Sequence, residues 1–170
     1  MAGNYIKPKA YNRHFALNLG TAEAPNWAEI AAGISSRGTS ISEGSEDFYY
    51  MNNRGSAESA ATTQKISRSF SGNRFIGDPL QDAIFIERLY DMNRREVEFL
   101  EWYDNMPSEK PNGMKGKCTI VVSDDGSGDT SNRENISFSL SINGKPEKGT
   151  VTAKEEGISF TSSASPAKEE

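Results

Sequence analysis

The chain has 170 residues, of which 35% are hydrophobic, and its mean hydropathy is -0.67. That length suits one domain, but so low an apolar fraction predicts a thin core, with many residues in loops, arms or shared surfaces. The net charge of -5 and the sequence pI near 5.1 argue against tight binding to nucleic acid, which requires clustered Lys and Arg. We therefore expect a chain that depends on neighbouring subunits for part of its order.

The N-terminal segment is short and basic. Lys7 and Lys9, followed by Arg13, give it a small positive charge. It lacks the apolar stretch of a secretory signal, and no apolar run approaches the roughly 20 residues needed to cross a bilayer. The single cysteine, Cys118, cannot form an internal disulfide. These features predict a soluble protein made in a reducing cytoplasm, with no membrane partner.

Two predicted strands flank a long polar segment. Residues 14–19 and residues 65–70 both show the alternation of a half-buried strand. Between them, residues 35–63 are rich in Ser, Thr, Gly, Asn and Glu and carry the cluster Phe48-Tyr49-Tyr50-Met51. A segment this long without a core pattern is normally functional or disordered. We expect a long hairpin or arm that orders against another subunit; the alternative is that the aromatic cluster forms a small local core under its own loop.

The clearest helix signal follows Gly77. Asp78 can cap the helix, Pro79 suits its first turn, and Gln81 stands at the spacing of a capping box. Apolar residues then fall on one stripe, so we expect a helix over residues 79–90 that packs on one face or at the open end of the sheets.

The second half of the chain has the patterns of strands. Residues 94–103 alternate with an imperfect phase, and residues 136–142 alternate strictly between large apolar residues and serines. Asn143-Gly144 is expected to end this second strand. Val151 and residues 158–160 then predict two more short strands in an antiparallel meander.

Residues with catalytic or metal-binding potential are few. His14 is the only histidine and lies on the polar phase of its strand, so we expect a surface or packing role. Cys118 is the first residue of an apolar strand. Because burial in apolar surroundings raises the pKa of a thiol, we expect Cys118 to be a small core residue and not a nucleophile. The acidic turn from Asp124 to Asp129 has glycines where an EF-hand needs its third and fifth ligands. We therefore expect no enzyme activity, no cofactor and no metal.

Several short motifs follow one another in a specific order. They are Trp27-x-x-Ile30-x-x-Gly33-Ile34, Ser69-Phe70-Ser71-Gly72-Asn73-Arg74, Gly77-Asp78-Pro79-x-Gln81-Asp82, and Ser137-Phe138-x-Leu140 followed by Gly144, Pro146 and Gly149. Over residues 27–149 this order resembles that of the major tail proteins, or tail tube proteins, of long-tailed siphophages with non-contractile tails.

The resemblance implies a mainly β fold of two packed antiparallel sheets, sandwich-like or barrel-like, with one flanking α-helix and a long arm. It implies a β domain over residues 13–161, preceded by an N-terminal arm over residues 1–12 and followed by a mobile tail over residues 162–170. It also implies a structural virion protein whose hexameric rings stack into the tail tube, the conduit for DNA ejection. The expected partners are other copies of the chain, the tape-measure protein, the tail terminator, distal tail or baseplate proteins and passing double-stranded DNA, with assembly in the bacterial cytoplasm.

The resemblance further implies roles for exposed side chains. The aromatic cluster of the arm and the basic residues Lys7, Lys9 and Arg13 would contact adjacent subunits or the next ring. Acidic residues would either complement this basic charge or face the lumen of the tube. These acidic residues are Glu43, Glu46 and Asp47 in the arm and Glu96 and Glu98 in a strand.

A carbohydrate-binding or receptor-binding β-sandwich is the main alternative. Trp27, Trp102, Tyr103 and Tyr49 would then be stacking residues, and the module would remain monomeric. A glycosidase built on paired carboxylates is less favoured, because no acidic pair in the sequence is bracketed by aromatic residues.

Overall fold

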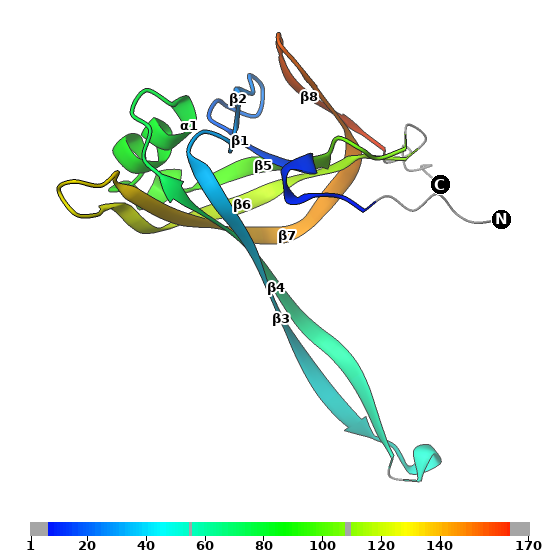
Figure 1. The fold of residues 1–170 in the computed structure, drawn as a ribbon. Coiled ribbons are helices and arrows are strands. Elements are labelled where there is room, and N and C mark those ends of the chain that lie inside the picture. The colour runs from blue at the N-terminus through cyan, green and yellow to red at the C-terminus, as the bar shows by residue number, and fades with distance from the viewer. Residues whose placement is uncertain (1–6, 55, 108–109, 164–170) are drawn as a thin grey trace.

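The computed structural model describes residues 7–54, 56–107 and 110–163, which form an antiparallel β body with a long projecting hairpin (Figure 1). The strands in these residues are β1 (Arg13–Asn18), β2 (Trp27–Glu29), β3 (Ile34–Tyr49), β4 (Ala57–Asn73), β5 (Glu96–Tyr103), β6 (Gly113–Ser127), β7 (Asn135–Lys154) and β8 (Gly157–Ser162). The predicted mainly β fold with a flanking helix is therefore confirmed. Residues 1–6 of the expected N-terminal arm and residues 164–170 of the expected tail lie outside the described part of the chain.

All of these strands belong to one continuous sheet rather than to two separate sheets. Its order is β2-β1-β5-β6-β7-β4-β3, and β8 pairs with β7. The sheet is strongly curved: Arg13 of β1 and Arg68 of β4 both bind the carboxylate of Glu101 on β5. Arg37 of β3 also donates a hydrogen bond of 2.9 Å to the carbonyl oxygen of Arg13. The two halves of the sheet therefore face each other, which gives a sandwich-like body.

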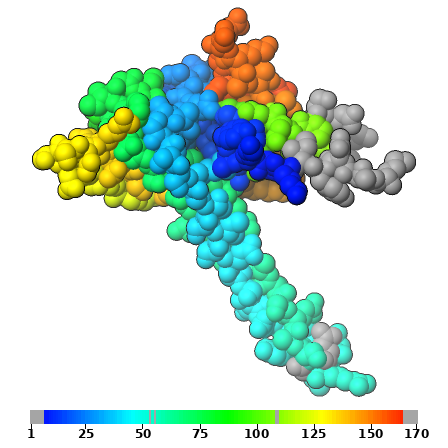
Figure 2. All heavy atoms as spheres, viewed as in Figure 1, coloured from blue at the N-terminus to red at the C-terminus, as the bar shows by residue number. Residues whose placement is uncertain are grey.

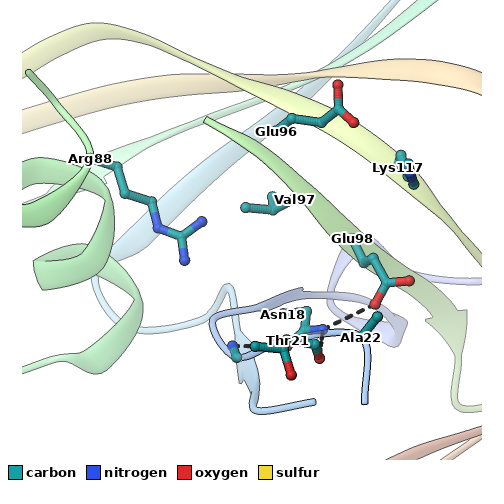
Figure 3. Close-up of a pocket in the computed structure, with 9 residues that line it drawn as sticks. Asn18, Thr21, Ala22, Arg88, Glu96, Val97, Glu98 and Lys117 are labelled. Carbon is teal, nitrogen blue, oxygen red and sulfur yellow. Dashed lines mark hydrogen bonds between the residues drawn. The ribbon is translucent and has the colours of Figure 1, made fainter. Parts of the chain in front are cut away.

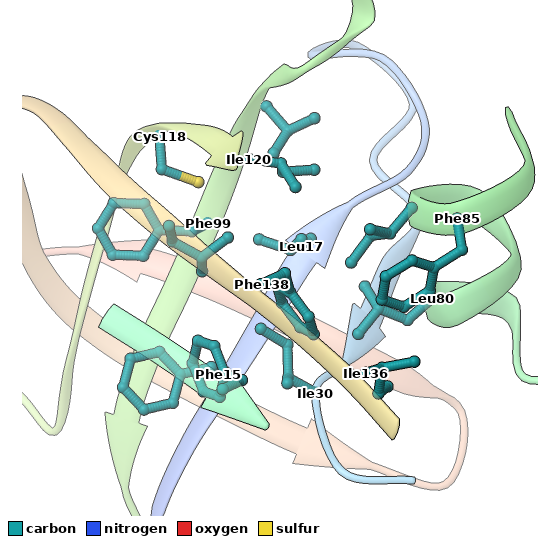
Figure 4. Close-up of a cluster of buried hydrophobic side chains, with 14 residues drawn as sticks. Phe15, Leu17, Ile30, Leu80, Phe85, Phe99, Cys118, Ile120, Ile136 and Phe138 are labelled. Atoms are coloured by element: carbon teal, nitrogen blue, oxygen red, sulfur yellow. The ribbon is translucent and has the colours of Figure 1, made fainter. Parts of the chain in front are cut away.

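The main core fills the concave side of the sheet beneath the helix (Figure 4). Phe138 stacks on Phe70 with ring centroids 5.3 Å apart, and Phe15 meets Phe70 edge-on at 5.2 Å. Phe85 of the helical segment packs edge-on against Phe138 at 6.0 Å. These aromatic contacts join strands β1, β4 and β7 to the helical segment.

A smaller core lies on the opposite face of the sheet. It consists of Ala16, Leu100, Trp102 and Val151, with Ile158 and Phe160 of β8 packed against it. Strand β5 is therefore buried on both faces over part of its length. This explains the imperfect alternation over residues 94–103, because a strand covered on both sides carries apolar residues on both phases.

The helix is shorter than the sequence predicts. It consists of α1 (Pro79–Asp82) and a π-helical turn over Ala83–Glu87, so it ends before residue 90. The carbonyl oxygens of Arg88 and Leu89 beyond it accept hydrogen bonds from the Arg95 guanidinium. Arg95, which lies outside the helix, therefore supplies hydrogen bonds to backbone carbonyl groups just beyond the end of the helix.

The start of the helix differs from the expected capping box. The Asp78 carboxylate accepts a hydrogen bond of 2.9 Å from the backbone N–H of Gln81, as an N-cap does. The Gln81 side chain does not return to the cap. Instead its amide accepts from the backbone N–H of Phe75 at 2.7 Å and donates to the carbonyl of Ala32 at 2.7 Å. Buried Gln81 thus joins the helix to the two loops that contain Ala32 and Phe75.

Strand β7 runs past the predicted end at Asn143-Gly144. Strand β6 remains paired with it as far as Gly149, and a register shift between Lys115 and Lys117 lies opposite Gly144. Gly144 has φ +71°, which glycine adopts without strain. The prediction of a strand end was therefore wrong, and Val151 belongs to β7 itself.

Candidate assembly surfaces

The hairpin formed by β3 and β4 leaves the body as a free arm (Figures 1 and 2). Strand β4 pairs with β7 only from Ser67 to Asn73, whereas β3 and β4 stay paired out to Tyr49 and Ala57. The free part is about 30 Å long at the usual rise of a strand. A two-stranded ribbon with no third strand or covering helix is marginally stable in water, so this arm needs a partner surface.

The tip of the arm carries exposed aromatic and apolar side chains. Phe48 and Tyr50 stack with ring centroids 6.3 Å apart. Tyr49 is 67% exposed and Met51 is 98% exposed. Phe48 is half-buried and packs on Tyr50 within the tip, whereas Tyr49 and Met51 remain available to another surface.

Acidic side chains flank the aromatic tip. Glu43 accepts a hydrogen bond of 2.7 Å from Gln64, and Asp47 accepts one from the Ser59 hydroxyl. Glu46 and Glu58 are exposed and form no salt bridge within the described residues. The arm tip thus combines apolar surface with a net negative charge, because Glu46, Asp47 and Glu58 outnumber Arg54 between residues 46 and 58.

A buried ionic cluster fixes the base of the arm to the body. Glu101, which is 3% exposed, binds Arg13 and accepts from Arg68 Nε at 3.3 Å. Arg68 also donates a hydrogen bond of 3.0 Å to Thr39 of β3. Burial lowers the pKa of Arg13 and of Arg68, and Arg37 nearby adds to this effect. The charge of Arg13 is paired with Glu101 of the same subunit, whereas Lys7 and Lys9 are exposed.

Glu96 and Glu98 border a cavity of about 260 Å³ that Arg88 and Lys117 also line (Figure 3). Glu98 accepts hydrogen bonds of 3.0 Å from Asn18 and from Lys115. Burial alone would raise the pKa of Glu98, but these two partners outweigh it and lower that pKa. The carboxylate of Glu98 at this cavity is therefore held in its ionised form by Asn18 and Lys115.

One face of the sheet, opposite the main core, is covered by small hydroxyl side chains. In the ladder of β4 and β7, Ser67, Ser69 and Ser71 stand directly opposite Ser141, Ser139 and Ser137. Strand β3 adds Ser36 and Ser40, and β6 adds Thr119. We call this set the serine face. The sequence predicts a row of serines on β7 alone. It does not predict that serines of β3 and β4 stand beside this row, because the pairing of strands that are far apart in the chain leaves no local pattern.

The other residues considered for catalysis or metal binding have structural roles. His14 lies between Glu29 and Asp104 and stacks on Trp102 with ring centroids 5.3 Å apart. Cys118 is buried, and burial raises the pKa of its thiol to about 12. Asp124 accepts hydrogen bonds from the backbone of its own turn.

Two further properties can be stated for the described residues. They contain no group of three or more His, Cys, Asp or Glu side chains arranged to hold a metal ion. Within them, no helix has the length and apolar character needed to span a membrane.

A curled antiparallel sheet, a short helix on its core side and a long free hairpin define the class of fold. The chain resembles the solved tail of an empty gene transfer agent particle with C6 symmetry, with TM-score 0.59 and 17% identity, covering 92% of this chain and 100% of that one. It also resembles the SPP1 tail tube, with TM-score 0.60 and 16% identity over 80% of this chain and 76% of that one. The cap that terminates the tube of the anti-feeding prophage gives TM-score 0.52 and 9% identity over 96% and 95% of the two chains.

The chain therefore has the tail tube fold, and the resemblance predicted from the sequence motifs is confirmed at the level of fold. The matched structures are a tail, a tail tube and a tube-terminating cap. No protein-family model matches the sequence, and no curated protein is detectably similar to it in sequence.

Proposed function

We propose that this chain is the structural subunit of a virion tail tube, in which hexameric rings stack into a conduit for DNA ejection. One observation carries the proposal: the fold matches, over 92% of the chain, that of a subunit from a tail with C6 symmetry. The free arm supports it, because such a ribbon is only marginally stable without a partner surface.

Ring formation also accounts for the open edges of the sheet. Strand β2 at one edge has three residues, and the other edge is formed by β3, the outer strand of the arm. Unpaired edges of this kind favour aggregation in a monomer, whereas neighbours in a closed ring can cover them. The thin core predicted from composition would be completed in the same way.

The serine face is the surface best suited to the wall of the conduit. Small hydroxyl side chains offer no cationic partner to phosphate, so DNA would pass without binding tightly. Glu96 stands opposite Thr119 in the sheet and so borders this face, which makes it the better candidate for an acidic lumen residue. Glu98 faces Lys117 and is already paired with Lys115.

Further partners follow from the resemblance. The tube would enclose the tape-measure protein before ejection, and its ends would bind a tail terminator and distal tail or baseplate proteins. Assembly would take place in the bacterial cytoplasm. Phe48, Tyr49, Tyr50 and Met51 of the arm, together with Lys7 and Lys9, would then contact adjacent subunits or the next ring.

The sugar-binding alternative has little support from the aromatic residues. Trp102 is 3% exposed and lies in the smaller core, and Trp27 packs against that core. Trp27 and Trp102 belong to β2 and β5. Tyr49 is the last residue of β3, and that strand runs out from the body along the arm (Figure 1). The aromatic residues therefore do not share a stacking platform.

Sedimentation and negative-stain microscopy of the purified protein test the proposed function. We expect rings or tubes that increase with concentration. A matched variant removes the arm by joining Ile41 to Ile66, which face each other in the ladder, through a two-residue Asn-Gly turn. This variant should keep its β circular dichroism but form no tubes. A wild-type protein that stays monomeric at high concentration would contradict the proposal.

A further inference from the structure

A second surface on the body has the chemistry to receive the arm tip. It is a groove of about 310 Å³ between the end of β5 and the start of β6, with Tyr103, Met106, Pro111 and Met114 among its lining residues. Lys110 and Lys148 stand at the same groove. We call these six residues the methionine groove. It lies apart from the serine face and from the cavity beside Glu98.

The methionine groove is apolar and carries unpaired positive charge. Lys110 and Lys148 are exposed and form no salt bridge within the described residues. Glu101 also lines the groove, but Arg13 and Arg68 hold its carboxylate, so its negative charge is compensated. Such a surface favours an apolar or aromatic segment flanked by carboxylates.

The arm tip has this composition on one face. Glu46 and Phe48 alternate along β3, and Tyr50 continues this alternation in extended backbone directly after the strand, where its ring stacks on Phe48. Phe48 stands opposite Glu58 in the ladder. Met51 at the end of the hairpin is almost fully exposed. Aromatic rings and methionine thioethers form favourable contacts, and methionines adapt to irregular partners. The acidic residues would meet Lys110 and Lys148.

We propose that the arm tip of one copy docks in the methionine groove of another copy. This inference rests on the proposed function, since it names the surface that receives the arm. The arm of the same chain is not the occupant, because the free ribbon projects away from the body (Figure 2). Its length is about 30 Å at the usual rise of a strand. That reach exceeds the radius of gyration of a compact chain of this length, about 15 Å, so the tip reaches a neighbouring body.

A competing apolar surface is less complementary to the arm. Ile76, Ile86 and Met92 are exposed around the helical segment. Glu87 and Asp91 lie among them in the sequence, and Arg94 is already bound to Glu87 at 3.5 Å. Asp91 at this surface would repel the acidic tip and the salt bridge occupies Arg94, whereas the lysines of the methionine groove attract the tip. Met92 therefore provides a matched control for Met106.

Cysteine cross-linking distinguishes the two surfaces. Met51→Cys combined with Met106→Cys, exposed to a mild oxidant after assembly, should give a ladder of covalent oligomers on non-reducing gels. Met51→Cys combined with Met92→Cys should give none, nor should either single variant. The native Cys118 is fully buried and does not compete. A ladder from the Met92 pair in place of the Met106 pair would overturn the proposal.

Charge reversal gives an independent test. Lys110→Glu with Lys148→Glu should raise the concentration needed for tubes on the order of tenfold. Adding Glu46→Lys and Glu58→Lys in the same chain should restore it, while circular dichroism stays unchanged throughout. Unaltered assembly of the lysine variant would overturn the docking site while leaving the tube function intact. Failure of the wild-type protein to form rings or tubes would instead overturn the function itself.

Discussion

At the residue scale, the buried carboxylate of Glu101 has the largest predicted effect on stability. It is the anionic partner of both Arg13 and Arg68, whose side chains are 17% and 12% exposed. Glu101→Ala would leave these two guanidinium groups close together without a counter-charge. We expect a loss of about 3 kcal/mol in the free energy of unfolding, measured by urea denaturation.

Glu155→Ala is the matched control for this substitution. Glu155 is exposed in the turn between β7 and β8, so its removal should change the unfolding free energy by less than about 0.5 kcal/mol. If both variants unfolded at the same urea concentration, the cluster at the base of the arm would contribute nothing to stability.

His14 predicts a dependence of stability on pH. Its ring nitrogens are 2.6 Å from Glu29 and 2.5 Å from Asp104, so the protonated imidazolium can donate to both carboxylates. Burial lowers the pKa of His14, but these two partners outweigh it and raise that pKa above the ordinary histidine value of about 6.5. The stabilisation is therefore complete below about pH 6.5 and is lost as the pH rises through the higher folded-state pKa.

Urea denaturation at several pH values, between about pH 6 and pH 9, tests this effect. The wild-type protein should lose unfolding free energy relative to His14→Gln as the pH rises, because glutamine does not titrate. Parallel pH profiles of the two proteins would show that the paired carboxylates do not favour the imidazolium.

At the element scale, local patterns predicted the elements whose signals lie within a few residues. The alternation over residues 136–142 predicted a half-buried strand, and Ile136, Phe138 and Leu140 are buried in β7. Asp78 and Pro79 indicated where the helix begins. The absence of a core pattern over residues 35–63 indicated a hairpin or arm, and these residues lie mainly in β3 and β4.

Features set by contacts between distant segments were not predictable. Strand β7 continues past Gly144 because β6 pairs with it, and no residue near Gly144 encodes that pairing. Gln81 fits a capping box by spacing, but its side chain bonds instead to backbone groups of two loops. The alternation over residues 94–103 is compatible with Glu101 on the core-facing side of the strand. Its arginine partners could not be predicted, because they come from the distant strands β1 and β4. The lysines of the methionine groove are likewise far apart in the sequence, because Lys110 precedes β6 and Lys148 lies in β7.

At the scale of the whole molecule, a free arm and open sheet edges couple folding to assembly. Binding between folded copies stabilises the folded state by mass action, since unfolded chains do not form the same interfaces. Each tenfold rise in protein concentration should add about 1.4 kcal/mol of stability per subunit. For a chain of this length, that gain corresponds to a rise of about 4 °C in Tm.

Calorimetry over a range of protein concentrations measures this coupling. The Tm of the wild-type protein should rise with concentration wherever sedimentation shows assembled material. The variant that joins Ile41 to Ile66 keeps the ionic cluster at the arm base but lacks the tip, so its Tm should depend much less on concentration. If wild-type tubes formed while the Tm stayed constant, the subunit would be fully stable alone, and assembly would only arrange bodies that were already complete.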